Sequence, residues 1–442
     1  MNYQEAMQYI KKIRAEYASD YTLDDVTQLC ERAGRPDKKL RIIHIAGTNG
    51  KGSVGAYISN ALAMSGYTVG RFVSPALIHE REQIQKIYGT SLEIQTEYIS
   101  EEEAAENLTV LAGHCEEMVK EGWHQPTAFE IETVMALRQM ALWHVDVAVI
   151  ETGMGGRLDA TNLIEKPVLT VFTRISLDHT AILGDTLEQI TEQKLGILKD
   201  HVPAVTVRQT PEVMELIRTH CQRRGLHLRI ADIQNTMQQD FQLSGTEFLY
   251  KGRHYHLNQL GMYQMENALL AIEAMEELER IGFYKVNESS TGRALRETKW
   301  PGRFEVISRS PYMILDGAHN PSGAQMLRRS LEIYFPTKRF TYVFGVFRDK
   351  DYHAILDQML PLARRVYTVN AVGSRAVPSG ELAQIVRKQL GDRPVPVADC
   401  ATVAEALEQI RRSGRSETVV VFGSLSFLHE IYRYYDTLRY IN

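Results

Sequence analysis

Short apolar runs alternate along the chain with stretches in which apolar residues recur at helical spacing. The runs are rich in β-branched residues and nearly free of polar positions, which is typical of parallel strands covered on both faces. They lie at 41–46, 67–73, 145–150, 168–175, 312–315, 340–346, 365–370 and 418–422. Helices between such strands imply right-handed βαβ units, so the pattern predicts an α/β protein with a mostly parallel sheet.

The pattern changes in two places. Between 232 and 256 the segments become shorter, more polar and alternating, which predicts an antiparallel hairpin. A helix is predicted over 262–281, and the "WPG" at 300–302 breaks the helical pattern before a new strand begins. We therefore expect two domains, 1–298 and a smaller α/β domain at 299–442, a number that suits the length of the chain.

Charge and apolar content narrow the function classes. The 50 basic and 55 acidic residues give a net charge of −5, which predicts no binding of nucleic acid or an anionic membrane. No apolar run approaches the ~20 residues that span a bilayer, and the N-terminal "MNYQEAMQYIKKIRAEY" predicts an amphipathic helix without a signal-peptide core. The scattered cysteines form no C-x-x-C pair and predict reduced thiols (Cys30, Cys115, Cys221, Cys400). We expect a cytoplasmic protein.

The stretch "RIIHIAGTNGKGSV" joins a predicted strand to a loop of small residues and one lysine. Its glycines let backbone N–H groups approach phosphate, a helix expected to begin near Val54 adds positive potential, and Lys51 adds a charge. Ser53 is suited to phosphate or Mg²⁺. The spacing is shorter than G-x-x-x-x-G-K-[ST], and a plain glycine-rich turn is the alternative. Gly-Lys-Gly-Ser at a strand-to-helix junction nevertheless favours phosphate binding.

Three polar side chains follow other predicted strands: Ser74, Glu151 and His179. Ligands of an open parallel sheet bind beyond the carboxyl ends of its strands, so these side chains are expected to face the phosphate loop. Hard oxygen ligands suit Mg²⁺, which keeps waters and shares phosphate oxygens, although an imidazole is a less usual ligand. Each residue also has a structural interpretation: a helix cap, a solvated strand end or a core histidine.

Lys194 lies within "GDTLEQITEQKLGILKD", a predicted helix with Asp185 and Glu188 in capping-box register. Helical counting places Lys194 on the apolar face of that helix (Leu187, Ile190, Ile197, Leu198). A buried ammonium is costly unless it is paired or neutralised. The side chain either extends to the edge of the face or, beside a cation site, reacts with CO₂ to give an anionic carbamate that ligates metal.

Seven segments together resemble the folylpolyglutamate synthase/dihydrofolate synthase family of the Mur ligase superfamily. They are "HIAGTNGKGS", "SP", "FEIETVMAL", "IETGMGGRLDATN", "ISLDHTAILGDTLEQITEQKLGILK", "WPGRFE" and "DGAHNPSG". The matches run from about 40 to 325. The resemblance implies a P-loop-containing N-terminal Mur-ligase-type domain that binds ATP and folate, followed by a Rossmann-like α/β glutamate-ligase domain.

The resemblance also implies roles for individual residues. The ATP phosphates would be held by Thr48, Asn49, Gly50, Lys51, Gly52 and Ser53. Further ATP contacts would come from Asn267, Arg303 and Asp316. Two Mg²⁺ ions would be ligated by Ser74, Glu151, His179 and carbamylated Lys194. The incoming glutamate and the γ-phosphate would meet at His319. The pteroate pocket would be lined by Thr127, Ala128, Phe129, Glu130, Leu158, Asp159 and Ala160.

The implied reaction is ATP-dependent ligation of L-glutamate to a reduced folate through an acyl phosphate, by a monomer. The nearest alternative is a bifunctional enzyme that also glutamylates dihydropteroate. A cell-wall Mur ligase and a regulatory P-loop NTPase also remain open. The chain departs from the family after Ser-Pro, where the stretch 76–99, interpreted as a loop, is divergent, and this leaves the folate preference open.

Overall fold

The chain folds into two compact units. The computed structural model describes residues 1–442 except 18–21, 91–92, 374, 415 and 442. Unit 1 comprises Met1–Ser176, Leu183–Thr236 and Glu266–Thr298, and unit 2 comprises Leu177–Ile182, Met237–Met265 and Lys299–Asn442. One junction therefore falls between residues 298 and 299, and unit 2 also includes the polar segment from 237 to 265.

An eight-stranded sheet forms the centre of unit 1 as the structure describes it, in the order β4-β3-β2-β5-β1-β6-β7-β8. From β2 to β8 all neighbouring strands are parallel. The strands are β1 Ile42–Ala46, β2 Val69–Phe72, β3 Ile84–Gly89, β4 Ile94–Tyr98, β5 Val147–Glu151, β6 Leu169–Phe172, β7 Ala204–Val207 and β8 Leu228–Ala231. The four strands β2, β5, β1 and β6 are buried at every position, as their apolar runs predict.

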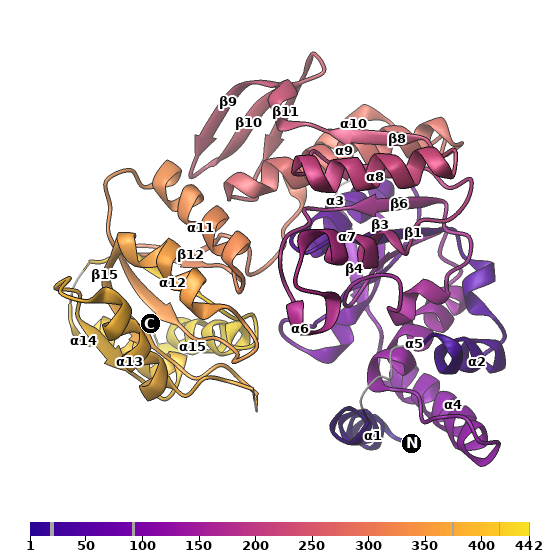
Figure 1. Ribbon diagram of the computed structural model, residues 1–442, viewed down its shortest axis with the longest axis horizontal. Coiled ribbons are helices and arrows are strands. Elements are labelled where there is room, and N and C mark those ends of the chain that lie inside the picture. Colours follow the sequence, from indigo (N-terminus) through magenta and orange to yellow (C-terminus); the bar gives the residue numbers. More distant parts are fainter. Residues whose placement is uncertain (18–21, 91–92, 374, 415, 442) are drawn as a thin grey trace. The chain divides into compact units, whose positions relative to one another are not determined.

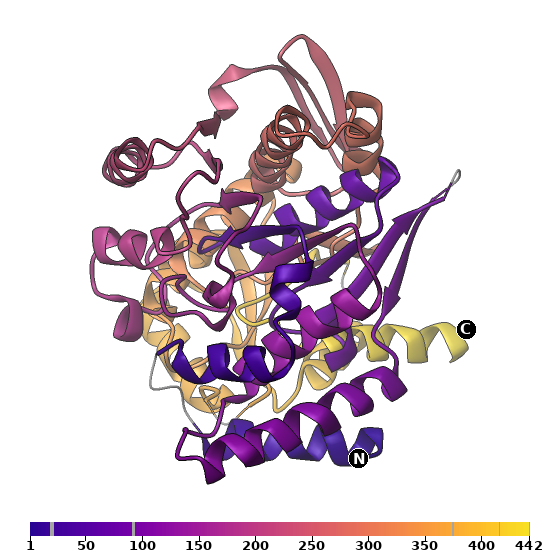
Figure 2. The same cartoon turned by 90° about the vertical axis from the view of Figure 1, so that its right-hand side faces the viewer.

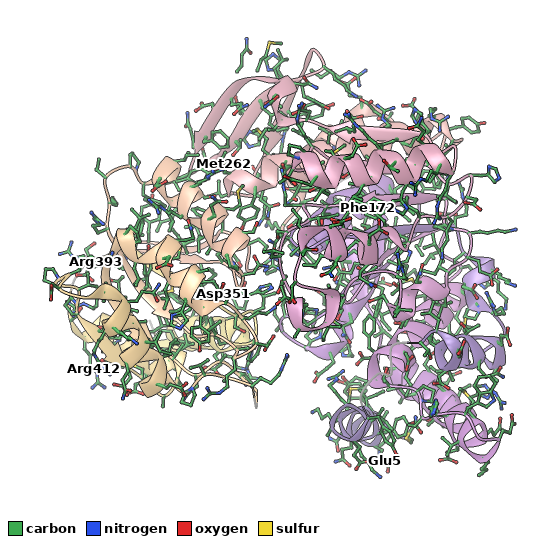
Figure 3. All side chains as sticks on the ribbon, in the orientation of Figure 1. Glu5, Phe172, Met262, Asp351, Arg393 and Arg412 are labelled. Atoms are coloured by element: carbon green, nitrogen blue, oxygen red, sulfur yellow. The ribbon has the colours of Figure 1, made fainter. Side chains whose placement is uncertain are left out.

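Helices cover both faces of this sheet. They are α1 Tyr3–Glu16, α2 Asp24–Arg32, α3 Lys51–Met64, α4 Glu101–Lys120, α5 Ala128–Leu142, α7 Leu187–Leu195, α8 Pro211–Arg223, α9 Met262–Arg280 and α10 Glu288–Glu297 (Figure 1). Apolar side chains of α1, α2, α4 and α5 form one core with Ile42 and Ile150 of the sheet. Those of α7 and α8 form another with Ala46 and Phe172, and Phe172 is fully buried (Figure 3).

Unit 2 contains a six-stranded sheet among its described residues, in the order β12-β13-β17-β14-β15-β16. All neighbours are parallel except β12 and β13. The strands are β12 Glu305–Arg309, β13 Tyr312–Leu315, β14 Phe340–Phe344, β15 Ala363–Thr368, β16 Val397–Asp399 and β17 Val419–Phe422. The helices are α11 Pro321–Tyr334, α12 Tyr352–Met359, α13 Ser379–Leu390, α14 Val403–Arg412 and α15 Leu428–Ile441. The mixed α/β class with mostly parallel sheets is confirmed.

The polar segment predicted as a hairpin is a separate small sheet in unit 2, in the order β11-β10-β9. Its strands are β9 Thr236–Gln242, β10 Gly245–Tyr250 and β11 Arg253–Leu257. β10 and β11 pair antiparallel, as the alternating pattern predicts. Buried Phe248 stacks on Tyr255 across the two strands at 5.6 Å between ring centroids.

Three local predictions were wrong. The stretch 76–99 is not a loop throughout, because β3 and β4 lie within it, pair antiparallel and extend the sheet at its edge, drawn in violet in Figure 2. The helix after the phosphate loop begins at Lys51 and not near Val54, because Gly50 takes the left-handed N-cap conformation. Helix α7 is capped by Thr186 with Gln189, one residue later than the predicted Asp185 and Glu188.

Two observations bear on the predicted environment of the chain. Among the described residues, no helix combines the length and apolar character that crossing a membrane requires. Cys30, Cys115, Cys221 and Cys400 are free and buried, and burial raises the pKa of all four thiols. A raised thiol pKa makes the reactive thiolate rarer at neutral pH.

Candidate active site

The phosphate loop, residues 47–53, is attached by hydrogen bonds to the segment that follows β6 within unit 1. The backbone N–H groups of Thr48 and Asn49 donate to the carbonyl of Arg174 at 2.8 and 3.2 Å. The Thr48 hydroxyl donates to the carbonyl of Ser176 at 2.9 Å. The loop that follows β1 is therefore attached to the segment that follows β6, the neighbouring strand, and its remaining N–H groups are held at the start of α3.

Two glycines are required by the path of this loop. Gly47 has φ 152°, and a Cβ there would lie 1.9 Å from the Thr173 hydroxyl. Gly50 has φ 98°, and a Cβ there would lie 2.5 Å from Oδ1 of Asn267 on α9. Asn267 is 5% exposed. The structure thus brings Asn267 against the phosphate loop, as its proposed share in ATP binding requires, and only glycine allows so close an approach.

Lys51 and Lys194 converge on one carbonyl oxygen. Nζ of Lys51 donates to the Gly47 carbonyl at 3.3 Å, and Nζ of Lys194 donates to the same oxygen at 3.0 Å. Lys194 is 3% exposed, so its ammonium does not extend to the edge of α7. Two like charges held around one loop repel each other and are stabilised by an anion placed between them. This arrangement suits a phosphate group.

Glu151 and Ser74 also meet within unit 1. They follow β5 and β2, which are neighbouring parallel strands, and the Ser74 N–H donates to Oε1 of Glu151 at 2.5 Å. Glu151 is 5% exposed, and Arg71 on β2 is equally buried. Burial lowers the pKa of Arg71 to about 10, whereas the charge of Glu151 opposes that shift. The Glu151 carboxylate therefore contacts the backbone of Ser74 where the adjacent strands end.

Of the proposed magnesium ligands, Ser74, Glu151 and Lys194 lie in unit 1 and His179 lies in unit 2. Among the described residues, no group of three or more His, Cys, Asp or Glu side chains is arranged to hold a metal ion. Mg²⁺ keeps several waters and is usually bound through one or two carboxylates together with substrate phosphates. Glu151 beside Ser74 fits that requirement, because the buried carboxylate offers oxygen and the rest of the shell can come from water and phosphate.

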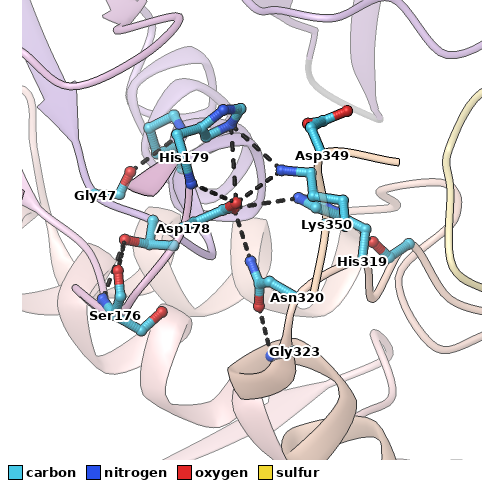
Figure 4. A network of polar contacts seen from close by, with 12 residues as sticks. Gly47, Ser176, Asp178, His179, His319, Asn320, Gly323, Asp349 and Lys350 are labelled. Atoms are coloured by element: carbon cyan, nitrogen blue, oxygen red, sulfur yellow. Dashed lines mark hydrogen bonds and ion pairs between the residues drawn. The ribbon is translucent and has the colours of Figure 1, made fainter. Parts of the chain in front are cut away.

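His179 lies in unit 2, next to a buried ionic cluster that the sequence analysis did not predict (Figure 4). Asp178 accepts hydrogen bonds from Nζ of Lys350 at 2.7 Å and from Nδ2 of Asn320 at 2.9 Å. Nε2 of His319 is 3.6 Å from the same carboxylate. Burial alone would raise the pKa of Asp178, but the hydrogen bond and charge of His319, with the charges of Lys350 and His179, lower it well below its usual range.

His319 is oriented by its own backbone. Its Nδ1 is 2.7 Å from the carbonyl oxygen of Gly317, so Nδ1 carries a hydrogen and donates. Nε2 is then the ring nitrogen that faces Asp178. This places His319 in a cluster with the Lys350 ammonium, the Asn320 amide and the Asp178 carboxylate. The cluster lies at the N-terminus of α11, where Asn320 is the N-cap residue.

Arg303 and Asp316 lie near each other in unit 2. Asp316 is 3% exposed and accepts hydrogen bonds from the Tyr263 hydroxyl at 2.5 Å, the Phe304 N–H at 3.0 Å and the Ala318 N–H at 2.8 Å. Burial raises the pKa of Asp316, and those hydrogen bonds and the charge of Arg303 oppose that rise. Most acceptor positions of this carboxylate are therefore used inside unit 2.

The proposed pteroate segments serve the structure of unit 1 first. Thr127 and Glu130 form a capping box at the start of α5, with the Thr127 N–H donating to Glu130 at 2.7 Å. Phe129 stacks on Phe72 at 6.0 Å between ring centroids. Ala128 and Ala160 are buried, Leu158 is 43% exposed, and the carboxylate of Asp159 accepts hydrogen bonds from its own loop. Of these residues, Phe129 and Leu158 offer apolar surface and Asp159 offers a carboxylate.

Comparison with known proteins decides the family. The model of the Mur ligase middle domain matches residues 45–275, more than half of the chain, and that of the Mur ligase glutamate ligase domain matches 302–425. The chain is 33% identical over 439 residues to the dihydrofolate synthase/folylpolyglutamate synthase of Bacillus subtilis, across 97% of this chain and 98% of that protein. This chain belongs to the folylpolyglutamate synthase/dihydrofolate synthase family of Mur ligases.

Solved structures of folylpolyglutamate synthases have the same fold over nearly the whole chain. The Mycobacterium tuberculosis folylpolyglutamate synthase complexed with ADP superposes with a TM-score of 0.83 at 26% identity, covering 97% of this chain and 98% of that one. A folylpolyglutamate synthase complex with AMPPCP and folate gives 0.82 at 27% identity, covering 98% of both chains. The predicted family and fold class are confirmed, and the members of this family are ligases.

In this member of the folylpolyglutamate synthase family, the structure brings together several polar residues that the sequence analysis did not single out. Asp178, Lys350 and Asn320 are among them. Asn320 carries a readable signal, because an asparagine followed by proline is typical of a helix N-cap. The capping box of Thr127 and Glu130 is also readable as T-x-x-E. Nothing in the local sequence indicates that Lys350 contacts Asp178.

Proposed function

We propose that this chain ligates L-glutamate to a reduced folate at the expense of ATP. A carboxylate oxygen of the folate attacks the γ-phosphorus of ATP, the bond to the β,γ-bridging oxygen breaks, and ADP leaves. The amino group of glutamate then attacks the acyl phosphate carbonyl, loses a proton and expels phosphate as the amide forms. The convergence of Lys51 and Lys194 on the phosphate loop is the observation that carries this proposal.

The chain's own contribution to phosphoryl transfer is to position charge. Lys51, together with Lys194 in its ammonium form, concentrates positive charge at the loop. The backbone N–H groups at the start of α3 point at any phosphate bound there. Both lysines are held by hydrogen bonds within the protein, so little reorganisation accompanies charge development in the transition state. Thr48, Asn49, Gly52 and Ser53 complete the proposed phosphate contacts, and Asn267 lies beside them.

Mg²⁺ is the cofactor that this chemistry requires, and when bound it would neutralise the charge that develops on the phosphate oxygens. Glu151 and Ser74 would hold it, with His179 as the further proposed ligand. We keep the carbamate on Lys194 as part of the proposal, because the amine is buried and reaches the phosphate loop. As the carbamate it would ligate a second Mg²⁺, and as the ammonium it would bind phosphate directly.

The remaining site residues keep proposed roles. Arg303 and Asp316 would contact ATP, and His319 would contact the incoming glutamate and the γ-phosphate. Phe129, Leu158 and Asp159 would bind the pteroate moiety, with Thr127, Ala128, Glu130 and Ala160 shaping the segments that carry them. The division of labour between 1–298, for ATP and folate, and 299–442, for glutamate, belongs to the same proposal. So do the cytoplasmic location and the monomeric state.

The first test is phosphate release with ATP and Mg²⁺ in the presence and absence of a reduced folate and glutamate. Release that needs both co-substrates, with the glutamylated folate found by mass spectrometry, supports the ligase. Release that is independent of glutamate would instead favour a regulatory NTPase. A substrate that carries a UDP-sugar peptide and replaces folate would favour a cell-wall ligase.

A second activity toward dihydropteroate is favoured by one comparison, because the Bacillus subtilis relative carries both names. The test is a competition assay that measures kcat/KM for dihydropteroate and for a reduced folate, since this ratio defines specificity. We expect the reduced folate to be favoured. Preference for dihydropteroate by more than about tenfold, roughly 1.4 kcal/mol of transition-state binding, would reverse the ranking.

A further inference from the structure

A fully buried histidine in the middle of β1 has no part in the proposed reaction. His44 is 0% exposed and pairs in register with Ile150 on one side and Thr170 on the other. Burial lowers the pKa of His44 to about 3, and the charge of Lys199 acts in the same direction. The imidazole is therefore neutral at physiological pH. A neutral polar ring in a central strand is costly to bury unless it makes a hydrogen bond.

The ring makes that hydrogen bond to Thr161 in the 3-10 turn Ala160–Leu163. Nε2 of His44 is 2.8 Å from the Thr161 hydroxyl, and the hydroxyl donates to Oδ1 of Asp159 at 2.5 Å. A hydroxyl has one hydrogen, so toward His44 it can only accept. His44 must then be the Nε2–H tautomer, and the hydrogens of the chain run in one direction, from imidazole to hydroxyl to carboxylate.

Asp159 is the end of this chain of hydrogen bonds. Its Oδ1 accepts from both the N–H and the hydroxyl of Thr161, and its Oδ2 accepts from the Met154 N–H at 2.8 Å. A carboxylate offers about two acceptor positions on each oxygen, so Oδ1 is filled and one position remains on Oδ2. Asp159 is 7% exposed. Burial raises the pKa of Asp159, while the hydrogen bonds from Thr161 and Met154 and the charge of Lys51 oppose that rise.

The chain also joins two loops of the candidate site. His44 lies in β1, three residues before the phosphate loop begins at Gly47, whereas Thr161 and Asp159 lie in the segment that follows β5. Successive hydrogen bonds in a buried setting polarise one another, which strengthens the hydrogen bond from the Thr161 hydroxyl to Asp159. Rotating the Asp159 carboxylate would break the bonds on Oδ1, so the direction of its remaining acceptor position is set from within the sheet.

We propose that His44 and Thr161 are positioning residues that fix the Asp159 carboxylate, leaving one Oδ2 acceptor position for an N–H donor of the acceptor substrate. The inference rests on the proposed function, which assigns Asp159 to the pteroate segment. The donor class is a ring N–H or amino group, which the aminopyrimidine ring of a folate carries. Neither His44 nor Thr161 touches substrate. Both act through Asp159, and the Nε2–H tautomer is required for that action.

The kinetic test uses a matched pair of variants at one position. Thr161→Val keeps the shape of the side chain and removes the hydroxyl, and Thr161→Ser keeps the hydroxyl. We expect Thr161→Val to raise the KM for reduced folate about tenfold, as loss of a bond to a charged group does, with kcat and the KM for ATP changed less than threefold. Thr161→Ser should return the folate KM to within about threefold of wild type. A purely structural role would move both KM values together. An unchanged folate KM in a folded Thr161→Val variant, or an equal rise in both, would overturn the inference.

The tautomer can be measured without substrate, which separates this inference from the proposed function. In the full-length protein labelled with ¹⁵N-histidine, the ring of His44 should show a protonated Nε2 and an unprotonated Nδ1 throughout the neutral pH range. His44→Gln, whose amide can donate in place of Nε2–H, should keep more folate affinity than His44→Leu. An Nδ1–H tautomer, or equal affinities in these two variants, would contradict the relay. Absence of any folate ligation by wild type would instead remove the proposed function, and the role toward folate with it.

Discussion

The ammonium of Lys194 donates to the carbonyl oxygen of Gly47 at 3.0 Å, although 147 residues separate them along the chain. Lys51 donates to the same oxygen from the first turn of α3. Two cations therefore meet at one oxygen of the phosphate loop, and α7 is attached to that loop through a buried lysine. The first prediction follows from this contact.

Lys194→Ala should lower kcat about 100-fold, because one fixed charge at the transferred phosphate is removed. Lys199→Met is the control, because it changes a half-buried lysine just after the end of α7. Its kcat should stay within about threefold of the wild-type value. For the carbamate, wild type incubated with ¹³C-bicarbonate should give a carbamate signal, and acetate should partly restore Lys194→Ala. Full activity in CO₂-free buffer without that signal would exclude the carbamate and leave the ammonium.

Gly50→Ala should weaken ATP binding and destabilise unit 1. The new Cβ would lie 2.5 Å from Asn267 at a φ of 98°, which costs roughly 1–3 kcal/mol of folding free energy. Gly55→Ala, also in α3, is the matched control. Its new Cβ would make ordinary contacts, at 3.7 Å to Ile45 and 3.8 Å to Val149. Urea denaturation and ATP titration measure the two effects. Equal stability and ATP affinity in both variants would mean that the loop adapts freely.

Glu151→Gln should raise the Mg²⁺ concentration needed for half-maximal activity at least tenfold and lower the maximal rate about 100-fold. The amide keeps an acceptor for the Ser74 N–H, so the local structure should persist. Glu132→Gln, which changes another buried glutamate outside the candidate site, serves as the control. The measurement is the activity of wild type, Glu151→Gln and Glu132→Gln as a function of Mg²⁺ concentration. A curve for Glu151→Gln that overlays that of wild type would refute the ligand assignment.

Glu132 should make the stability of the chain fall between about pH 4.5 and pH 7. Burial raises the pKa of Glu132 from 4.5 to about 7, with the charge of Arg14 opposing the shift. In that window the unfolded state has released the proton and the folded state keeps it, so the unfolding free energy falls by about 3 kcal/mol as pH rises, and the contribution is constant above pH 7. Urea denaturation of wild type and Glu132→Gln at several pH values checks the sign. A difference that does not change with pH would contradict the prediction.

The central strands could be predicted from the sequence because their environment leaves a clear pattern. β1, β5 and β17 are buried at every position, and continuous apolar runs mark such strands. β4, with the sequence "IQTEY", is an edge strand with three exposed positions. Polar residues are tolerated there because one side of the strand faces no partner, so the segment was interpreted as a loop. Edge pairing depends on the neighbouring strand and has little local signal.

The candidate site divides in the same way. Ser74 and Glu151 could be expected to meet, because each stands at the end of a strand of one parallel sheet. In the structure the Ser74 N–H donates to Oε1 of Glu151 at 2.5 Å. The contacts of Asp178 with Lys350 and Asn320 depend on tertiary structure that no spacing encodes. Thr127 and Glu130 were chosen from a motif shared with a family, and the structure shows that both side chains cap α5; their part in folate binding stays a prediction.

The strand order of unit 1 has a consequence for how this protein is made. β1 carries the phosphate loop, and its two neighbours, β5 and β6, are synthesised long after it. Pairings between such distant segments form slowly because their ends must first be brought together. The nascent chain therefore emerges with a phosphate loop that has no strand on either side. If ATP binds this loop only when the sheet is complete, it stabilises the finished protein and does not act as a template for the early steps of folding.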